Sequence, residues 1–199
     1  GHLTKYLSQS CWKVITFEID PNLYQKTFRS LSDLRNIVFF NQDFLQADLL
    51  QILNPYLKHP FKIVANIPYN ISTPVLFKIV QAPLPWKMMV IMVQKEFGQK
   101  IIAQPDDRRR VALSVVFQMR FQVQQCLEVS RGSFQPMPLV NSVVLQCFPL
   151  TNPLNIETID RVAQLAQFLF QHRRKKIGNT LKSLLGPTSI IDTIFPFDK

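Results

Sequence analysis

The sequence is poor in the residues that build metal sites and disulfide frameworks. Its 199 residues contain three histidines, His2, His59 and His172, which lie far apart and lack the spacing of metal ligands. The three cysteines are scattered and odd in number. They support neither a disulfide framework nor a zinc site, and they fit a reducing compartment. We therefore expect no metal and a cytoplasmic protein.

Long apolar runs are also missing. No stretch approaches the length of a membrane span and no signal peptide is visible, so we expect no membrane partner. We also expect a monomer. Glycine is scarce at five residues, and the chain opens in mid-pattern at Gly1 rather than at Met. We expect the chain to be a piece of a longer protein.

Positive charge is what the sequence has in excess. The net charge is +10, which a fold does not need but a polyanionic partner exploits. The charge gathers in "DDRRR" (106–110) and in "HRRKK" (172–176), the second within an apparently helical segment. A nucleic-acid partner is one interpretation; a basic, merely soluble protein is the other.

Strand-like and helical segments alternate along the first half of the chain. Apolar, β-branched runs predict strands at 13–19, 36–44, 61–67 and 87–97, and amphipathic runs predict helices at 21–31, 45–53 and 72–81. This alternation indicates an α/β fold with a parallel sheet that helices cover on both faces.

The later part of the chain changes character. Residues 121–130 and 141–150 read as two strands joined by a Pro-rich loop too short for a crossover helix, so they should form an antiparallel hairpin at a sheet edge. Residues 149–153 read as a linker, and apolar residues recur at helical spacing from 156 to 185. We predict a main domain over 1–149 and a small α-helical appendage over 154–199.

Polar residues stand at three successive strand ends. Glu18 in "FEID" suits a ribose, whose hydroxyls need an acceptor, and Asp43 beside Phe44 in "NQDF" suits an adenine. Asn66 ends the third strand. The alternative is that such acids cap helices or lie in solvated turns. The Gly-rich loop that normally accompanies such a nucleotide site is absent apart from "GHLT".

The third strand runs into "ANIPYNIS" (65–72). Pro68 ends it, because proline lacks an N–H and keeps the preceding residue extended. Asn66 and Tyr69 are thus expected at the carboxyl end of a strand, where open α/β sheets bind their ligands. A simple strand-ending turn is the alternative.

Taken in order, these motifs resemble the ribosomal RNA adenine dimethyltransferases, the bacterial small-subunit enzymes in particular. The resemblance covers nearly the whole chain and rests on "GHLT", "FEID", "NQDF", "NIPYNIS", "VQKEF", "SFQPMPLVNSVV" and "QHRRKKIGNTL". The last motif favours the small-subunit enzymes over the related macrolide-resistance methyltransferases. The resemblance implies a Rossmann-like methyltransferase sheet.

The resemblance also implies a reaction and a partner. Methyl groups would pass from S-adenosylmethionine to N6 of two adjacent adenosines in 16S ribosomal RNA of the pre-30S particle. Two other functions stay open: methylation of large-subunit RNA, and a non-catalytic RNA-binding assembly factor on the same fold.

Site residues follow from the same resemblance. Asn66 and the Pro68 carbonyl would accept the hydrogens of N6, Tyr69 would stack on the target base, and Phe134 would close its other face. The expected cofactor-binding residues are Gly1, Glu18, Ile19, Asp43, Phe44 and Asn66. The two charge clusters, rather than the resemblance, supply the expected RNA-binding residues: Arg108, Arg109, Arg110, Arg173, Arg174, Lys175 and Lys176. The last four are expected to fan around a helix. The alternatives are a solvated basic face and a bridge from Arg173 or Arg174 to the main domain.

Overall fold

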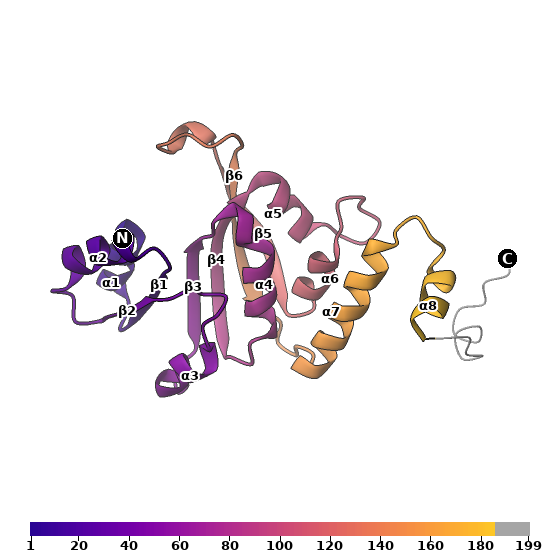
Figure 1. The fold of residues 1–199 in the computed structure, drawn as a ribbon, viewed down its shortest axis with the longest axis horizontal. Helices are drawn as coiled ribbons and strands as arrows, with labels where there is room; N and C mark the ends of the chain where they lie inside the picture. The colour runs from indigo at the N-terminus through magenta and orange to yellow at the C-terminus, as the bar shows by residue number, and fades with distance from the viewer. Residues whose placement is uncertain (186–199) are drawn as a thin grey trace. The chain divides into compact units, whose positions relative to one another are not determined.

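The computed structural model describes residues 1–185 of the chain, which divides into two compact units, Gly1–Pro55 and Tyr56–Lys199. Each unit has its own sheet: β1–β2 in the first, and β3-β4-β6-β5 in the second (Figure 1). The strands expected in one sheet therefore form two hydrogen-bonded sheets. None of the helices in residues 1–185 is long and apolar enough to cross a membrane.

The elements follow one another largely as the sequence predicts. The first unit contains α1 (His2–Ser10), β1 (Val14–Glu18), α2 (Pro21–Leu31), β2 (Ile37–Asn41) and α3 (Leu49–Leu53), and the short helix η1 (Asn54–Tyr56) follows α3. The second contains β3 (Phe61–Asn66), η2 (Tyr69–Ile71), α4 (Ser72–Gln81), β4 (Trp86–Gln94), α5 (Lys95–Ile102), α6 (Ala112–Gln118), β5 (Phe121–Val129), η3 (Arg131–Ser133), β6 (Ser142–Pro149), α7 (Ile156–Gln171) and α8 (Ile177–Leu185).

Two capping aspartates set where the helices of the first unit begin. The Asp20 side chain accepts hydrogen bonds from the backbone N–H groups of Asn22 and Leu23, so α2 starts at Pro21 as predicted. The Asp48 side chain accepts from the Gln51 N–H, so α3 starts at Leu49 and not at residue 45.

The strands of the first unit are parallel, as predicted. Glu18 lies opposite Asn41 in the register, so β1 and β2 end at the same edge. Val14, Leu31 and Ile37 form the buried core of this unit. The pairing therefore places the residues after both strands close together.

The sheet of the second unit is mixed. β3 and β4 are parallel, β4 and β6 are antiparallel, and β5 pairs antiparallel with β6 as the outermost strand. The predicted edge hairpin is confirmed.

One face of this sheet carries the core of the unit. Met89, Ile91 and Leu145 are fully buried on it, and α4, α5 and α6 lie over one face of the sheet (Figure 1). Val90 and Met92, which point to the opposite face, are only half-buried. The expected helical cover of both faces is not seen within residues 56–185.

Helix α7 packs against α6 and α4. Its residues Ile159 and Ala163 are buried, and the Gln81 amide donates a 2.8 Å hydrogen bond to the Asp160 carboxylate. The helical segment after residue 153 is thus part of the packed second unit in residues 56–185. The functional boundary expected between residues 149 and 154 stays a prediction.

The expectation that residues 173–176 lie on a helix is wrong. Helix α7 ends at Gln171, and residues 172–176 form the connection to α8. The run from 171 to 176 contains no apolar residue, so a helix there has no face to bury.

Candidate active site

The Asn66 side chain is the free polar group at the end of β3. Asn66 is exposed and lies opposite Met92 of β4, and its amide makes no hydrogen bond within residues 1–185. The next residue, Ile67, is 3% exposed, and its N–H donates to the Met92 carbonyl at 3.2 Å. The backbone is therefore anchored while the amide remains available to a ligand.

The Pro68 carbonyl oxygen is already engaged. It accepts hydrogen bonds from the Ile71 N–H at 3.1 Å and from the Ser72 hydroxyl at 3.2 Å. A carbonyl oxygen has two lone pairs, and both have donors here. The accepting role expected for Pro68 stays a prediction, and it requires that either the Ile71 N–H or the Ser72 hydroxyl release its hydrogen bond to the Pro68 carbonyl.

Tyr69 is held by a residue far away in the sequence. Its hydroxyl lies 2.7 Å from the Ser142 hydroxyl, and Ser142, the first residue of β6, is fully buried. The half-buried Tyr69 ring is thus tethered through its polar end. Sequence reasoning gave Ser142 no role, although Ser142 lies within the motif "SFQPMPLVNSVV" of the resemblance, at the start of the strand "SVVLQCFP".

Phe134 lies in the loop between β5 and β6, directly after η3. It is half-buried and makes no ring contact within residues 1–185. The loop projects beyond the end of the sheet (Figure 1). The structure brings the end of this loop to Tyr69 through Ser142, but it does not bring Phe134 there. The role of Phe134 as the second stacking face stays a prediction.

In the first unit, the acidic residues predicted for the cofactor follow the paired ends of β1 and β2. Within residues 1–185, the Glu18 carboxylate accepts one hydrogen bond, from the Asp20 N–H at 3.0 Å, and the Asp43 carboxylate accepts one from the Leu45 N–H at 2.8 Å. The Asn41 amide donates to the Glu18 carbonyl at 2.8 Å and links the two turns. Both carboxylates keep acceptor capacity for the hydroxyl and amino groups of a nucleoside.

Apolar surface accompanies these carboxylates. Ile19 is 66% exposed, and Phe44 is half-buried with its ring edge-on to Phe17 at 5.4 Å between centroids. Gly1 caps the start of α1. Acceptors beside apolar side chains fit the sugar and base of an adenosine, as in S-adenosylmethionine.

Replacing Glu18 by Ala should weaken S-adenosylmethionine binding by roughly 1–3 kcal/mol, because the ligand's hydroxyls lose their acceptor. Calorimetry with the full-length protein measures this. Asp33→Ala is a control, since Asp33 is an exposed carboxylate of the same unit. Unchanged affinity in Glu18→Ala removes Glu18 from the site.

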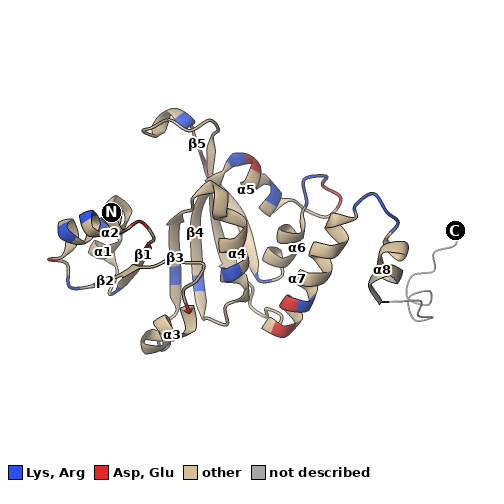
Figure 2. Ribbon diagram, in the orientation of Figure 1, with Lys and Arg blue, Asp and Glu red and all other residues tan. Residues whose placement is uncertain are grey.

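Two basic clusters distant in the sequence meet in the second unit. The Arg173 guanidinium donates a 3.1 Å hydrogen bond to the Arg108 carbonyl and lies over the Phe170 ring, 5.3 Å from its centroid. Figure 2 shows positive residues on both connections, α5–α6 and α7–α8. We call the exposed residues among these the basic surface: Arg108, Arg109, Arg173, Arg174, Lys175 and Lys176.

Not every predicted cation belongs to this surface. The half-buried Arg110 guanidinium donates to the Ala103 carbonyl at 2.5 Å and to the Gln118 side chain at 2.9 Å, so it braces the turn after α5. Arg109 is paired with Asp107 at 2.7 Å, and this hydrogen-bonded guanidinium lowers the pKa of Asp107 to about 2. The placement of Arg110 does not favour an RNA contact.

The described part of the chain holds no cluster of three or more potential metal ligands among its His, Cys, Asp and Glu residues. The cysteines are free thiols, and burial raises the pKa of Cys147 to about 12. A thiol with so high a pKa stays protonated at neutral pH and is a poor nucleophile.

Comparison with known proteins bears on this site. A family model described as "Ribosomal RNA adenine dimethylase" matches residues 1–192. The "Ribosomal RNA small subunit methyltransferase A" of Geobacter sulfurreducens is 37% identical over 183 residues, covering 92% of this chain and 66% of that protein. The protein of the same name from Lactiplantibacillus plantarum is 35% identical over 191 residues, covering 94% and 64%. The chain therefore spans less than two-thirds of the length of these two relatives.

Two solved structures are similar over most of the chain. A dimethyladenosine transferase from Plasmodium falciparum superposes with a TM-score of 0.73 at 25% identity, covering 98% of this chain and 67% of that one. The 23S rRNA methyltransferase ErmE superposes with a TM-score of 0.69 at 27% identity, covering 92% and 71%.

Proposed function

Because this chain belongs to the ribosomal RNA adenine dimethylase family, we propose that it transfers methyl groups from S-adenosylmethionine to N6 of two adjacent adenosines in small-subunit (16S) ribosomal RNA, giving N6,N6-dimethyladenosine. The observation that carries this proposal is the free Asn66 amide at the end of β3, followed three residues later by the tethered Tyr69. The names of the curated relatives support the small subunit as the substrate.

The chemical difficulty of this reaction is the weak nucleophile. The lone pair of the exocyclic N6 is delocalised into the adenine ring, and the bound cofactor supplies an electrophilic methyl group. The Asn66 side-chain oxygen would accept one N6 hydrogen and favour a pyramidal nitrogen, which makes the lone pair available for the methyl group. When bound, S-adenosylmethionine would supply the methyl group, whose bond to sulfur would break as its bond to N6 forms, and a proton would leave N6 for water. No carboxylate base is needed at the nitrogen.

The Pro68 carbonyl is the second acceptor in this scheme. Because it already accepts from Ile71 and Ser72, N6 has to compete with the Ser72 hydroxyl for the same oxygen. Asn66 has no such competitor within residues 1–185, so we assign the larger share of the orientation of N6 to Asn66.

The target base must leave its stack to be reached, and Tyr69 then stacks on it. The partner is the pre-30S particle, which the protein meets as a monomer in the cytoplasm, where ribosomal subunits assemble. No metal takes part in the proposed chemistry.

The test is methyl incorporation from labelled S-adenosylmethionine by the full-length protein into unmethylated small and large ribosomal subunits. Label in adenosines of the small subunit, absent with Asn66→Ala, supports the proposal. Label in the large subunit instead makes the chain a large-subunit enzyme, as the similarity to ErmE allows. Tight RNA binding without any label makes it an assembly factor.

The basic surface gives a separate prediction about RNA affinity. Replacing Lys175 and Lys176 together by Ala should weaken ribosomal RNA binding and reduce the slope of log affinity against log salt by about 0.9 for each lost phosphate contact. Cofactor binding and thermal stability should remain nearly unchanged, since both side chains are exposed. Binding titrations over a range of salt concentrations measure the slope.

A matched control is available on the sheet. Lys62 and Lys87 are exposed lysines near the starts of β3 and β4, at the end of these strands away from Asn66, and their joint replacement by Ala should leave the slope unaltered. An unaltered salt slope in the Lys175/Lys176 variant, or a large loss of its thermal stability, would mean that the α7–α8 connection has a structural role and does not bind RNA.

A further inference from the structure

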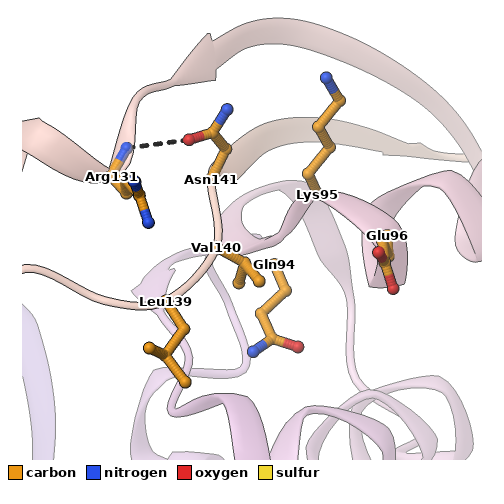
Figure 3. A pocket seen from close by; sticks show the side chains of 7 residues that line it. All are labelled: Gln94, Lys95, Glu96, Arg131, Leu139, Val140 and Asn141. Atoms are coloured by element: carbon orange, nitrogen blue, oxygen red, sulfur yellow. Dashed lines mark hydrogen bonds between the residues drawn. The ribbon is translucent and has the colours of Figure 1, made fainter.

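A pocket of about 310 Å³ opens between the start of α5 and the end of the β5–β6 loop (Figure 3). This volume lies near the lower end of the range for ligand sites. The lining residues are Gln94, Lys95, Glu96, Arg131, Leu139, Val140 and Asn141. No role has been assigned above to any of them, and all belong to the second unit.

Asn141 holds the walls of this pocket together. Its side-chain oxygen accepts a 3.1 Å hydrogen bond from the Arg131 N–H, and its carbonyl accepts a 2.9 Å bond from the Lys95 N–H. Its amide also donates to Glu128 at 3.1 Å, and Glu128 is paired with the Lys95 ammonium at 2.8 Å. The start of α5 and the two ends of the loop are thus fixed to one another, and the pocket is pre-formed.

Three polar side chains in the pocket have no partner within the described residues. The guanidinium of Arg131, the amide of Gln94 and the carboxylate of Glu96 make no hydrogen bond or ion pair within residues 1–185. Arg131 and Glu96 lie on opposite sides of the pocket in Figure 3. Leu139 and Val140 add apolar surface.

This distribution of groups matches one nucleotide of an RNA chain. A guanidinium binds a phosphate through two parallel hydrogen bonds, whereas a carboxylate repels phosphate and accepts from hydroxyl or amino groups. With the two on opposite sides, a phosphate fits on the Arg131 side and a ribose or base edge on the Glu96 side. The amide of Gln94 can donate and accept, and the apolar side chains can lie against a base.

The pocket adjoins the proposed catalytic site. Gln94 lies directly opposite Ser142 in the register of β4 and β6, and Asn141 precedes Ser142 in the chain. The Ser142 hydroxyl is the group 2.7 Å from the Tyr69 hydroxyl. A nucleotide in this pocket is therefore close to a base that stacks on Tyr69.

We propose that the pocket between α5 and the β5–β6 loop binds a nucleotide that neighbours the target adenosine, with its phosphate on Arg131 and its sugar or base on Gln94 and Glu96. The inference rests on the proposed function, because it takes the stacked base of Tyr69 as the target. It adds a subsite that selects RNA by the residue beside the target.

The test compares Arg131→Ala with the unchanged full-length protein on a small-subunit RNA fragment that contains the target adenosines. The KM for RNA should rise about tenfold, because one charge-assisted contact to phosphate is lost. The salt slope of RNA binding should fall by about 0.9. The kcat, the cofactor affinity and the thermal stability should stay nearly constant, since Arg131 is exposed.

RNA fragments with one neutral methylphosphonate, placed at each phosphate that flanks the target in turn, locate the contact. At one position the substitution should weaken binding to the unchanged protein but not to Arg131→Ala, because the two changes remove the same interaction. Arg161→Ala is the control and should behave like the unchanged protein, because Arg161 is an exposed arginine of α7 whose guanidinium pairs with Glu157 of the same helix.

The outcomes separate this inference from the proposed function. Unchanged KM and salt slope in Arg131→Ala, with the protein active on small-subunit RNA, overturn the subsite alone. The subsite is also overturned if, at every phosphate tested, the loss of binding free energy caused by the methylphosphonate is the same in Arg131→Ala as in the unchanged protein. An unmodified protein that methylates no small-subunit RNA overturns the proposed function, while the binding measurements still report on the pocket.

Discussion

Replacing Asn66 by Ala should lower the rate of methyl transfer by about a hundredfold to a thousandfold, the range seen when a group that stabilises a transition state is removed. Cofactor binding should change far less, because the contact to N6 strengthens as the nitrogen becomes nucleophilic. Single-turnover rates with labelled cofactor, together with calorimetric cofactor affinities, separate the two effects.

The structure indicates that this change leaves the fold intact. Asn66 is exposed and its amide is free of hydrogen bonds within residues 1–185, while the backbone is held by the ladder to β4 and by the buried Ile67. Asn152→Ala, which truncates an exposed asparagine in the connection before α7, is the control. A loss of cofactor affinity large enough to explain the whole loss of rate contradicts the proposed role.

The sequence predicted most of the fold because its local signals agree with its packing. The helices predicted at 21–31 and 72–81 are confirmed to the residue, since Asp20 and Pro21 mark the first and the turn at Pro68 precedes the second. The family and its methyltransferase fold are confirmed by the match over residues 1–192 and by the similar solved structures. The predicted helix over 173–176 is wrong: these residues are all charged, and a cluster of charges does not show whether a helix has an apolar face to bury.

Contacts between residues that are distant in the sequence could not be predicted from the sequence. Tyr69 and Ser142 are separated by 73 positions, and Arg173 and Arg108 by 65. No periodicity or spacing predicts that these side chains meet. The same applies to Arg110, which looks like its neighbours in "DDRRR" but turns inward to Gln118.

The tether on Tyr69 changes what its substitutions should do. Tyr69→Ala removes the stacking face, so binding of RNA with an accessible target adenosine should weaken by about 1–3 kcal/mol. It also leaves the buried Ser142 hydroxyl without its partner, and the free energy of unfolding should fall by about 1–3 kcal/mol. RNA titrations and thermal unfolding measure the two losses separately.

Tyr69→Phe keeps the ring and removes only the tether. RNA affinity should therefore fall less than in Tyr69→Ala, whereas the free energy of unfolding should fall in both, because the Ser142 hydroxyl is fully buried and loses the same partner. Adding Ser142→Ala to Tyr69→Phe removes the orphaned hydroxyl and should recover much of the stability. If Tyr69→Phe weakens RNA binding as much as Tyr69→Ala, the hydroxyl and its tether matter more than the stacking face, and Ser142 positions the ring on which the base is captured.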